Sequence, residues 1–598
     1  MKEQIERVAV KDEYKWDLTP IYKNDDLWYK DLEIAKEEIK KISNYTNLLD
    51  SASNLLEYII YDEKTERLLY KLYYYAHLNS DADTTDTNYQ KMVKIISDLM
   101  SEYSEKGSYV TPLFMKTDYS IIESYYKEEP KLKAYEFNIK NMYRYQKHTL
   151  TEEQEKMLSI LSTSLDNASD TYESLTDSDM KYGTIKDDEN KDVELTDSNY
   201  GKYISSKDRR VRKEAFNLMY KTYSEYKNTI TSTYNGDIDT NIALAKIRNY
   251  GSAREASLFS DNVGTDIYDN LIDTVNKNLN VLYKYYDLKK DVLKLDELHL
   301  YDVYADLIEV ETDEYEFEQA KELVINALNV LGEDYISTLK RAFDEKWIDI
   351  YNNKGKRSGA YSSGFYDTNP YILLNYEKQL KDVSTLAHEL GHSMHTYYSC
   401  KNNEYQYSSY KIFVAEVAST VNELLLSKYM LKNSTNKEEK LYILNRLMEL
   451  FKGTIFRQTM FAEFERDMYA KRENKEALTN DVLCDTYYEL NKKYFGPNVI
   501  VDEEIKYEWE RIPHFYYGFY VYKYATGLSA ACHIVDGILN EKEGALENYL
   551  NFLKTGGSMY PVDELKVAGV DISNPEVVES AIHMFDEVIE DFKKIVNE

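Results

Sequence analysis

Residues Asp382–Cys400 read DVSTLAHELGHSMHTYYSC, and this stretch has a strong helical period. An α-helix turns by about 100° per residue, so His388, His392 and His395 fall on one side. The opposite side is apolar and carries Val383, Leu386, Leu390, Met394 and Tyr397. We therefore predict a helix with Asp382 as its N-cap, a stripe of core residues and an opposing imidazole face.

The imidazole face predicts half of a zinc site. Two histidines four residues apart on a helix, His388 and His392, can both reach one Zn²⁺ at about 2.0–2.1 Å. Glu389 lies beside them and is the candidate general base. The alternative is a solvent-facing histidine pair, which is common on helices but usually lacks the intervening glutamate.

A third ligand is expected on the next helical segment, Ile412–Leu426 (IFVAEVASTVNELLL), where Glu416 and Glu423 share a face. A carboxylate among so many apolar residues is costly to bury without a metal or a partner, so Glu416 is the predicted ligand. Glu423 is expected to accept a hydrogen bond from a ligand imidazole. The alternative for Glu416 is an ordinary surface carboxylate.

His395 is the rival third ligand, because it points to the same side of the helix as the first two histidines. Three histidines on one straight helix would span about 10.5 Å along its axis, too far to converge on one ion. We therefore expect His395 to support a ligand or to face the substrate.

The composition predicts a mainly α fold. The 598 residues include only 8 Pro and 20 Gly, so turns and hairpins must be few. One exception is Ser358–Tyr376, which we predict to form two short strands joined by a turn. A short hairpin or loop is expected at Asp188–Thr196. We place a boundary there, with an N-terminal helical lobe at residues 1–200 and a catalytic domain at 201–598.

The charge excludes some partners. With 74 basic and 106 acidic residues the net charge is 74 − 106 = −32, so we expect no nucleic acid and no membrane as partners. The three cysteines, Cys400, Cys484 and Cys532, are too few for a disulfide framework. The charged first fifteen residues and the lack of a long apolar stretch predict a cytoplasmic protein. The sequence does not indicate an oligomeric state.

The whole chain resembles the oligoendopeptidase F group of the thimet oligopeptidase family of zinc peptidases. The matching motifs are Trp16–Tyr22 (WDLTPIY), His388–His395 (HELGHSMH), Phe413–Glu423 (FVAEVASTVNE), Phe456–Glu465 (FRQTMFAEFE) and Ile512–Gly527 (IPHFYYGFYVYKYATG). The resemblance implies a mainly helical, two-lobed body with a deep substrate channel and a small sheet near the zinc helix. It also implies one Zn²⁺ per chain, with Glu416 as the third ligand.

Further roles follow from the resemblance alone. It implies that His514, with Tyr520 and Tyr522, stabilises the oxyanion of the reaction. It implies that Gly359 and Ala360 offer a strand edge to the peptide backbone. The expected activity is hydrolysis of internal bonds of short, unstructured peptides by water that zinc and Glu389 activate.

Two other functions remain open at this stage. A metallocarboxypeptidase or dipeptidyl carboxypeptidase on the same scaffold would need a cation for the substrate's terminal carboxylate, and Arg457 or Arg511 could supply it. The other candidate function is that of a peptide-binding protein without enzymatic activity. The complete set of His388, Glu389, His392 and Glu416 argues against the last of these.

Overall fold

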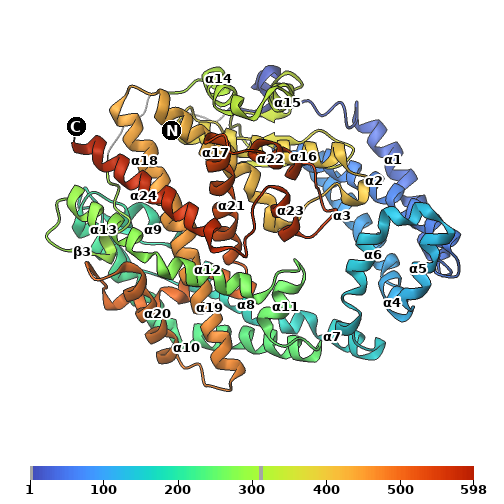
Figure 1. Ribbon diagram of the computed structural model, residues 1–598, viewed down its shortest axis with the longest axis horizontal. Helices are drawn as coiled ribbons and strands as arrows, with labels where there is room; N and C mark the ends of the chain where they lie inside the picture. The colour runs from blue at the N-terminus through green and yellow to red at the C-terminus, as the bar shows by residue number, and fades with distance from the viewer. Residues whose placement is uncertain (1–4, 309–313, 598) are drawn as a thin grey trace. The chain divides into compact units, whose positions relative to one another are not determined.

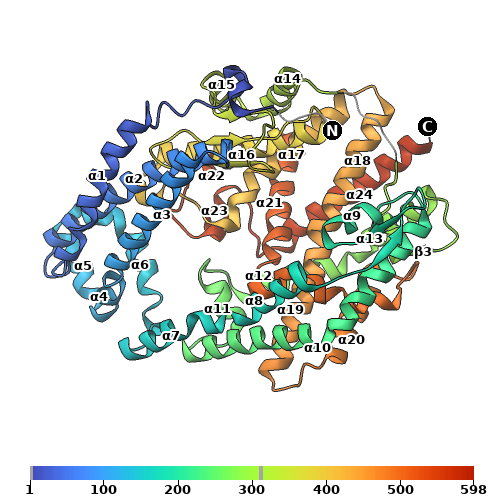
Figure 2. The same cartoon turned by 180° about the vertical axis from the view of Figure 1, so that it is seen from behind.

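The computed structural model describes residues 5–308 and 314–597, and helices dominate it (Figure 1, Figure 2). The predicted mainly α fold is confirmed, and the sheets are small. No helix in the described part of the chain is both long enough and apolar enough to cross a membrane. The cytoplasmic location stays a prediction.

The chain forms two compact units, and each is assembled from three segments. Unit 1 contains Met1–Thr149, Thr312–Met430 and Ile534–Gly569. Unit 2 contains Leu150–Glu311, Leu431–His533 and Val570–Glu598. The predicted division cuts the chain once, at residue 200, whereas each of the two units contains three separate segments. That division, and the deep channel between two lobes, stay predictions.

The helices of unit 1 include α1, α2 and α3, which pack against one another (Figure 1). They are α1 Asp25–Ile39, α2 Ala52–Ala82, α3 Thr87–Gly107, α4 Val110–Lys116, α5 Tyr119–Glu128, α6 Glu136–Tyr143, α14 Phe317–Leu328, α15 Glu333–Asp344, α16 Leu380–Asn402, α17 Ile412–Asn433, α22 Ala545–Phe552 and α23 Pro561–Val567. Helix α17 ends just beyond the unit boundary, and α21 (Tyr522–Leu539) also crosses it.

The helices of unit 2 include α10, α19 and α20, which lie side by side (Figure 2). They are α7 Glu152–Leu165, α8 Asn167–Ser174, α9 Asp197–Ile204, α10 Arg209–Ile247, α11 Ala253–Phe259, α12 Thr265–Lys277, α13 Leu279–Val292, α18 Lys437–Phe451, α19 Arg457–Glu473, α20 Asn480–Phe495 and α24 Pro575–Asn597. Two strand pairs belong here, β1 (Thr184–Lys186) with β2 (Asp192–Glu194), and β3 (Leu298–His299) with β7 (Val499–Ile500). The β1–β2 pair is antiparallel, so a hairpin is present where a hairpin or loop was expected, but it begins at Thr184 and not at Asp188.

Short polar side chains start several helices, as capping chemistry predicts. The Ser51 hydroxyl accepts a hydrogen bond from the amide of Asn54 at 3.2 Å, at the start of α2. Helix α16 begins earlier than expected, because Gln379 is its N-cap. Asp382 lies in the first turn, where its carboxylate accepts the Gln379 amide at 2.9 Å. The prediction of Asp382 as the N-cap was therefore wrong by three residues.

A three-stranded sheet in the order β4-β6-β5 lies against α16. The antiparallel pair β5 (Tyr361–Ser363) and β6 (Tyr371–Leu373) confirms the two predicted strands. Strand β4 (Ile348–Asp349) pairs in parallel with β6. Strand β5 is one of the two edge strands, and the hydroxyls of its Ser362 and of Ser393 on α16 lie 2.8 Å apart.

A buried ion cluster holds this sheet. The Asp349 side chain is fully buried in β4 and pairs with the buried Lys356 ammonium at 2.7 Å. Arg7 donates to the same carboxylate from the N-terminal segment, with Nη1 2.8 Å from Oδ1. Burial raises the pKa of Asp349, but the two cations outweigh it and hold this pKa below its usual range. The carboxylate is therefore charged and fully paired at neutral pH.

We predict that Asp349→Ala destabilises unit 1 by about 3–5 kcal/mol, because it leaves the Lys356 charge buried without a partner. Urea unfolding followed by tryptophan fluorescence reports on it, since Trp347 directly precedes β4. The difference from wild type should shrink as the pH falls below about 4, the ordinary pKa of aspartate in the unfolded chain, and should be lost once the pH has passed the lower pKa of the folded Asp349 carboxyl. Glu37→Ala, which breaks the exposed Lys40–Glu37 pair, is the control and should change little. Equal urea midpoints for all three proteins would contradict the prediction.

Candidate metal centre

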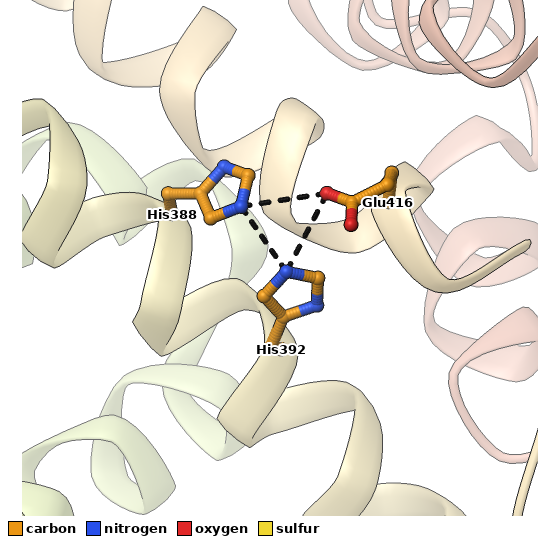
Figure 3. Close-up of side chains that lie close together, drawn as sticks. All are labelled: His388, His392 and Glu416. Atoms are coloured by element: carbon orange, nitrogen blue, oxygen red, sulfur yellow. Dashed lines mark hydrogen bonds and ion pairs between the residues drawn. The ribbon is translucent and has the colours of Figure 1, made fainter. Parts of the chain in front are cut away.

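Three side chains from two helices of unit 1 converge on one point (Figure 3). Helix α16 supplies His388 and His392, whose Nε2 atoms lie 3.1 Å apart. Helix α17 supplies Glu416, whose Oε2 atom lies 3.4 Å from Nε2 of His388 and 3.5 Å from Nε2 of His392. The three ligand atoms therefore form a nearly equilateral triangle.

This triangle has the dimensions of one face of a zinc tetrahedron. Ligand atoms that each lie about 2.1 Å from a tetrahedral ion are about 3.4 Å apart. The three observed distances, from 3.1 to 3.5 Å, are close to that value. Two imidazoles and one carboxylate also form a usual donor set for catalytic zinc, with a fourth position left for water. The residues present fit the metal.

Gly391 allows α16 and α17 to come close enough for this convergence. A Cβ atom at Gly391 would lie 2.5 Å from the Cα of Ser419 and 2.6 Å from the carbonyl oxygen of Ala418. Asn422 then joins the two helices, because its buried Nδ2 atom donates to the carbonyl of Ala387 at 3.1 Å. The absence of a side chain at Gly391 thus sets where Glu416 lies relative to the histidines.

Glu423 orients the first histidine. Its carboxylate shares a hydrogen bond with Nδ1 of His388, which leaves Nε2 directed at the triangle. Burial lowers the pKa of the His388 imidazole, but the carboxylates of Glu423, Glu389 and Glu416 outweigh it and raise this pKa to about 9. Without a metal the ring therefore carries a proton at neutral pH, and a metal must displace that proton.

The other two carboxylates have opposite environments. Hydrogen bonding to His392, together with the nearby imidazoles, lowers the pKa of Glu416 to about 2. Glu389 is only 6% exposed, and burial raises the pKa of its carboxyl although His388 and His392 oppose the change. Glu416 is thus ready to bind a cation, and Glu389 has the environment of a proton acceptor.

His395 lies outside the triangle. Its ring is fully buried and stacks on Tyr410, with centroids 3.7 Å apart. Burial lowers the pKa of His395 to about 3, so the imidazole is neutral. Within the described residues neither ring nitrogen has a hydrogen-bond partner. The imidazole face of α16 therefore carries two histidines, and the third belongs to the core.

The late aromatic motif belongs to unit 2. His514 and Tyr520 are half-buried, and the Tyr524 hydroxyl lies 3.5 Å from Nε2 of His514. Tyr522 is fully buried, with its ring 5.0 Å from that of Tyr268. Burial lowers the pKa of His514, so this imidazole is neutral at pH 7. The predicted roles of these residues at an oxyanion stay predictions.

The predicted strand edge begins slightly later than expected. Gly359 and Ala360 precede β5, and Gly359 has a φ of +85°, which favours glycine. The side chain of Asn375 donates to the Gly359 carbonyl at 2.8 Å and fixes this bend. Because β5 pairs only with β6 in the described part of the chain, its outer edge carries no strand partner there.

Comparison with known proteins decides the family. Residues 202–584 match peptidase family M3, and residues 114–182 match the domain described as Oligopeptidase F. The chain belongs to peptidase family M3. Oligopeptidase PepF of Bacillus subtilis is 42% identical over 99% of this chain and 88% of its own length. Group B oligopeptidase PepB of Streptococcus agalactiae is 37% identical over 99% and 98%.

Solved structures agree with this assignment. A putative peptidase from Chlamydophila abortus is 38% identical, with a TM-score of 0.94 over 99% of this chain and all of that chain. Oligoendopeptidase-F from Enterococcus faecium is 36% identical, with a TM-score of 0.73 over 96% and 99%. The resemblance to the oligoendopeptidase F group is confirmed, and this M3 chain is a peptidase.

Two residues of this M3 peptidase were missed by the sequence reasoning. Gly391 lies inside the His-Glu-x-x-His motif, and a glycine in a helix interior was the available signal, because it costs about 1 kcal/mol relative to alanine. Tyr524 was missed because the tyrosines of the late motif were judged without knowing which side of α21 is buried. Only the structure shows that Tyr522 is buried whereas Tyr524 is half-buried.

We predict that Gly391→Ala lowers the affinity for Zn²⁺ at least tenfold, because the added methyl pushes α17 and its Glu416 away from the histidines. Competition with a chromophoric chelator measures the affinity, and circular dichroism checks that the helices remain. Gly201→Ala in α9 is the matched control, since a Cβ there meets no atom within 4 Å. Wild-type affinity in the Gly391→Ala protein would show that the close contact does not place the ligand.

Proposed function

We propose that this M3 peptidase is a zinc-dependent oligoendopeptidase that hydrolyses internal bonds of short, unstructured peptides. The convergence of His388, His392 and Glu416 on one point is the observation that carries the proposal. The names of the relatives, oligopeptidase and oligoendopeptidase F, support the substrate class. The outer edge of β5, with Gly359 and Ala360 before it, is the proposed place for the peptide backbone.

Each residue of the site has a distinct task in this proposal. A Zn²⁺ held by the triangle would polarise the scissile carbonyl and lower the pKa of a water toward about 7. Glu389 accepts the proton of the attacking water and returns it to the leaving amine. Glu423 keeps His388 in the tautomer that presents Nε2. We retain His514 and Tyr520 as proposed oxyanion donors and add Tyr524, because buried Tyr522 is less suited to contact a substrate.

The carboxypeptidase alternative loses support from the ion pairs. Arg457 pairs with the buried carboxylate of Glu508 at 2.9 Å, and Arg511 pairs with Asp197 at 2.8 Å. Both guanidinium groups therefore already have counter-ions within unit 2, so neither is a ready partner for a substrate carboxylate. The complete ligand set likewise favours an enzyme over a protein that only binds peptides.

We predict that Glu389→Gln keeps the metal and lowers kcat by roughly 10²–10⁴, because only the proton acceptor is lost. Zinc content from atomic absorption and hydrolysis of a quenched fluorescent peptide are the two measurements. The wild-type enzyme should lose activity to a chelator and regain it with Zn²⁺. A Glu389→Gln enzyme with wild-type turnover would refute the assigned proton acceptor.

A second prediction separates Glu416 from His395 as the third ligand. Glu416→Ala should weaken Zn²⁺ binding at least a hundredfold, roughly the effect of losing a charged ligand contact. His395→Phe should leave the affinity unchanged, because phenylalanine keeps the stacking on Tyr410 and His395 lies outside the ligand triangle. Isothermal titration of the metal-free proteins gives both values. The reverse order of affinities would make His395 the ligand.

A further inference from the structure

A cavity of about 510 Å³ lies in unit 1, next to the metal centre and outside it. Thr396 on α16 lines the cavity one turn after His392, and Ser362 and Ser363 line it from β5. The hydroxyls of Tyr410 and Thr396 lie 3.0 Å apart. Burial raises the pKa of Tyr410, and the charge of Glu416 adds to this effect. The cavity therefore borders both the proposed peptide edge and the ligands.

The walls are mostly aromatic. Helix α2 contributes Tyr70 and Tyr74, four residues apart on one face. The ring of Tyr74 stacks on Phe365 with centroids 5.0 Å apart, and the rings of Tyr366 and Tyr405 meet edge to face at 5.7 Å. Aromatic faces attract cations as well as apolar groups, so these walls suit a long side chain with a positive end.

Glu66 supplies the one carboxylate among the lining residues, one turn before Tyr70 on α2. Its Oε2 atom accepts a hydrogen bond from the Tyr405 hydroxyl at 3.3 Å. No Lys, Arg or His in the described residues pairs with Glu66, and no donor there reaches its Oε1 atom. Burial and the neighbouring Asp62 raise the pKa of Glu66 to about 7, as expected for a carboxyl group that lacks a counter-ion.

The arginine nearest to Glu66 in sequence does not supply that counter-ion. The guanidinium of Arg67 lies over the ring of Tyr366, 4.8 Å from its centroid. It makes two hydrogen bonds to Asp367, at 2.7 and 2.5 Å, so its charge is already balanced. Glu66 is thus the acidic group of this cavity that has no basic partner among the described residues, and a bound cation would favour its charged form.

We propose that this cavity binds a positively charged group of the substrate peptide, with Glu66 as its counter-ion. The group is a lysine or arginine side chain, or the α-ammonium of the peptide. The inference rests on the proposed peptidase function and narrows its substrates. Thr396 lies about 6 Å along the helix axis from His392, and an extended peptide advances about 3.3 Å per residue. The wall of the cavity at Thr396 therefore lies about two residues of extended peptide from the ligand His392.

The experiment compares lysine with norleucine, which lacks only the ammonium. Each is placed in turn at every position within three residues of the scissile bond of one octapeptide. At one position the metal-loaded enzyme should show a kcat/KM about tenfold higher for lysine. Glu66→Gln should reduce this ratio to about one. Glu63→Gln, which changes a neighbouring α2 carboxylate that does not line this cavity, is the matched control and should keep the ratio.

N-acetylated and free peptides distinguish the two sources of charge. If the α-ammonium occupies the cavity, the lysine and norleucine peptides share it, so their ratio stays near one and N-acetylation lowers kcat/KM of both about tenfold in the wild type but not in Glu66→Gln. If a side chain occupies the cavity, the lysine preference persists after acetylation. A ratio near one at every position together with no effect of acetylation overturns the proposal, as does a preference that Glu66→Gln leaves intact.

Failure of the peptidase function itself has a different signature, because no peptide would then be hydrolysed. In that case fluorescence anisotropy of labelled peptides still tests the cavity. Binding that depends on Glu66 and is tighter for the lysine peptide, or for free over N-acetylated peptides, supports the proposal, and equal binding of lysine, norleucine and N-acetylated peptides overturns it.

Discussion

The contact of α16 with α17 at Gly391 is the constraint on which the metal centre depends. A metal triangle with sides of 3.1 to 3.5 Å tolerates little displacement of any ligand. Two ligands share one helix and are fixed by its geometry, but Glu416 reaches them only because the helix backbones approach at Ser419. Asn422, held also by the Tyr335 hydroxyl at 2.9 Å, keeps the crossing closed through buried hydrogen bonds. Packing therefore prepares the centre before any ion binds.

Electrostatics then assigns different tasks to three nearby glutamates. Glu423 is committed to a hydrogen bond with His388, and the imidazoles keep Glu416 ionised, so Glu416 is not suited to receive a proton at neutral pH. Glu389 is the buried one, and burial raises the pKa of its carboxyl, whereas the pKa of Glu416 is lowered. A bound divalent ion would lower the pKa values of Glu389 and Glu416, but it would act on groups whose burial and partners already differ.

Local periodicity made half of this site predictable. His388, Glu389 and His392 follow from the turn of one helix, and the β5–β6 pair follows from a turn between a stretch of small residues and an apolar run. His395 was placed on the imidazole face because helical spacing shows the side of the helix on which a residue lies, but not which other residues cover its side chain. Tyr410, fifteen residues later, buries that ring. Strand β4 was likewise missed, since its partner β6 lies more than twenty residues away and parallel pairing leaves no local signal.

One helix connects the parts of the site that the proposed endopeptidase activity requires. Helix α16 carries two proposed metal ligands, and one turn later Thr396 lines the cavity that Glu66 also lines. The same helix anchors β5 through Ser393 and Ser362, so the strand edge cannot slide relative to the ligands without breaking that contact. The wall of the cavity at Thr396 is then held relative to the two histidines by helix geometry rather than by a flexible loop. In such an arrangement the position of a basic residue in the peptide would select which bond is cleaved.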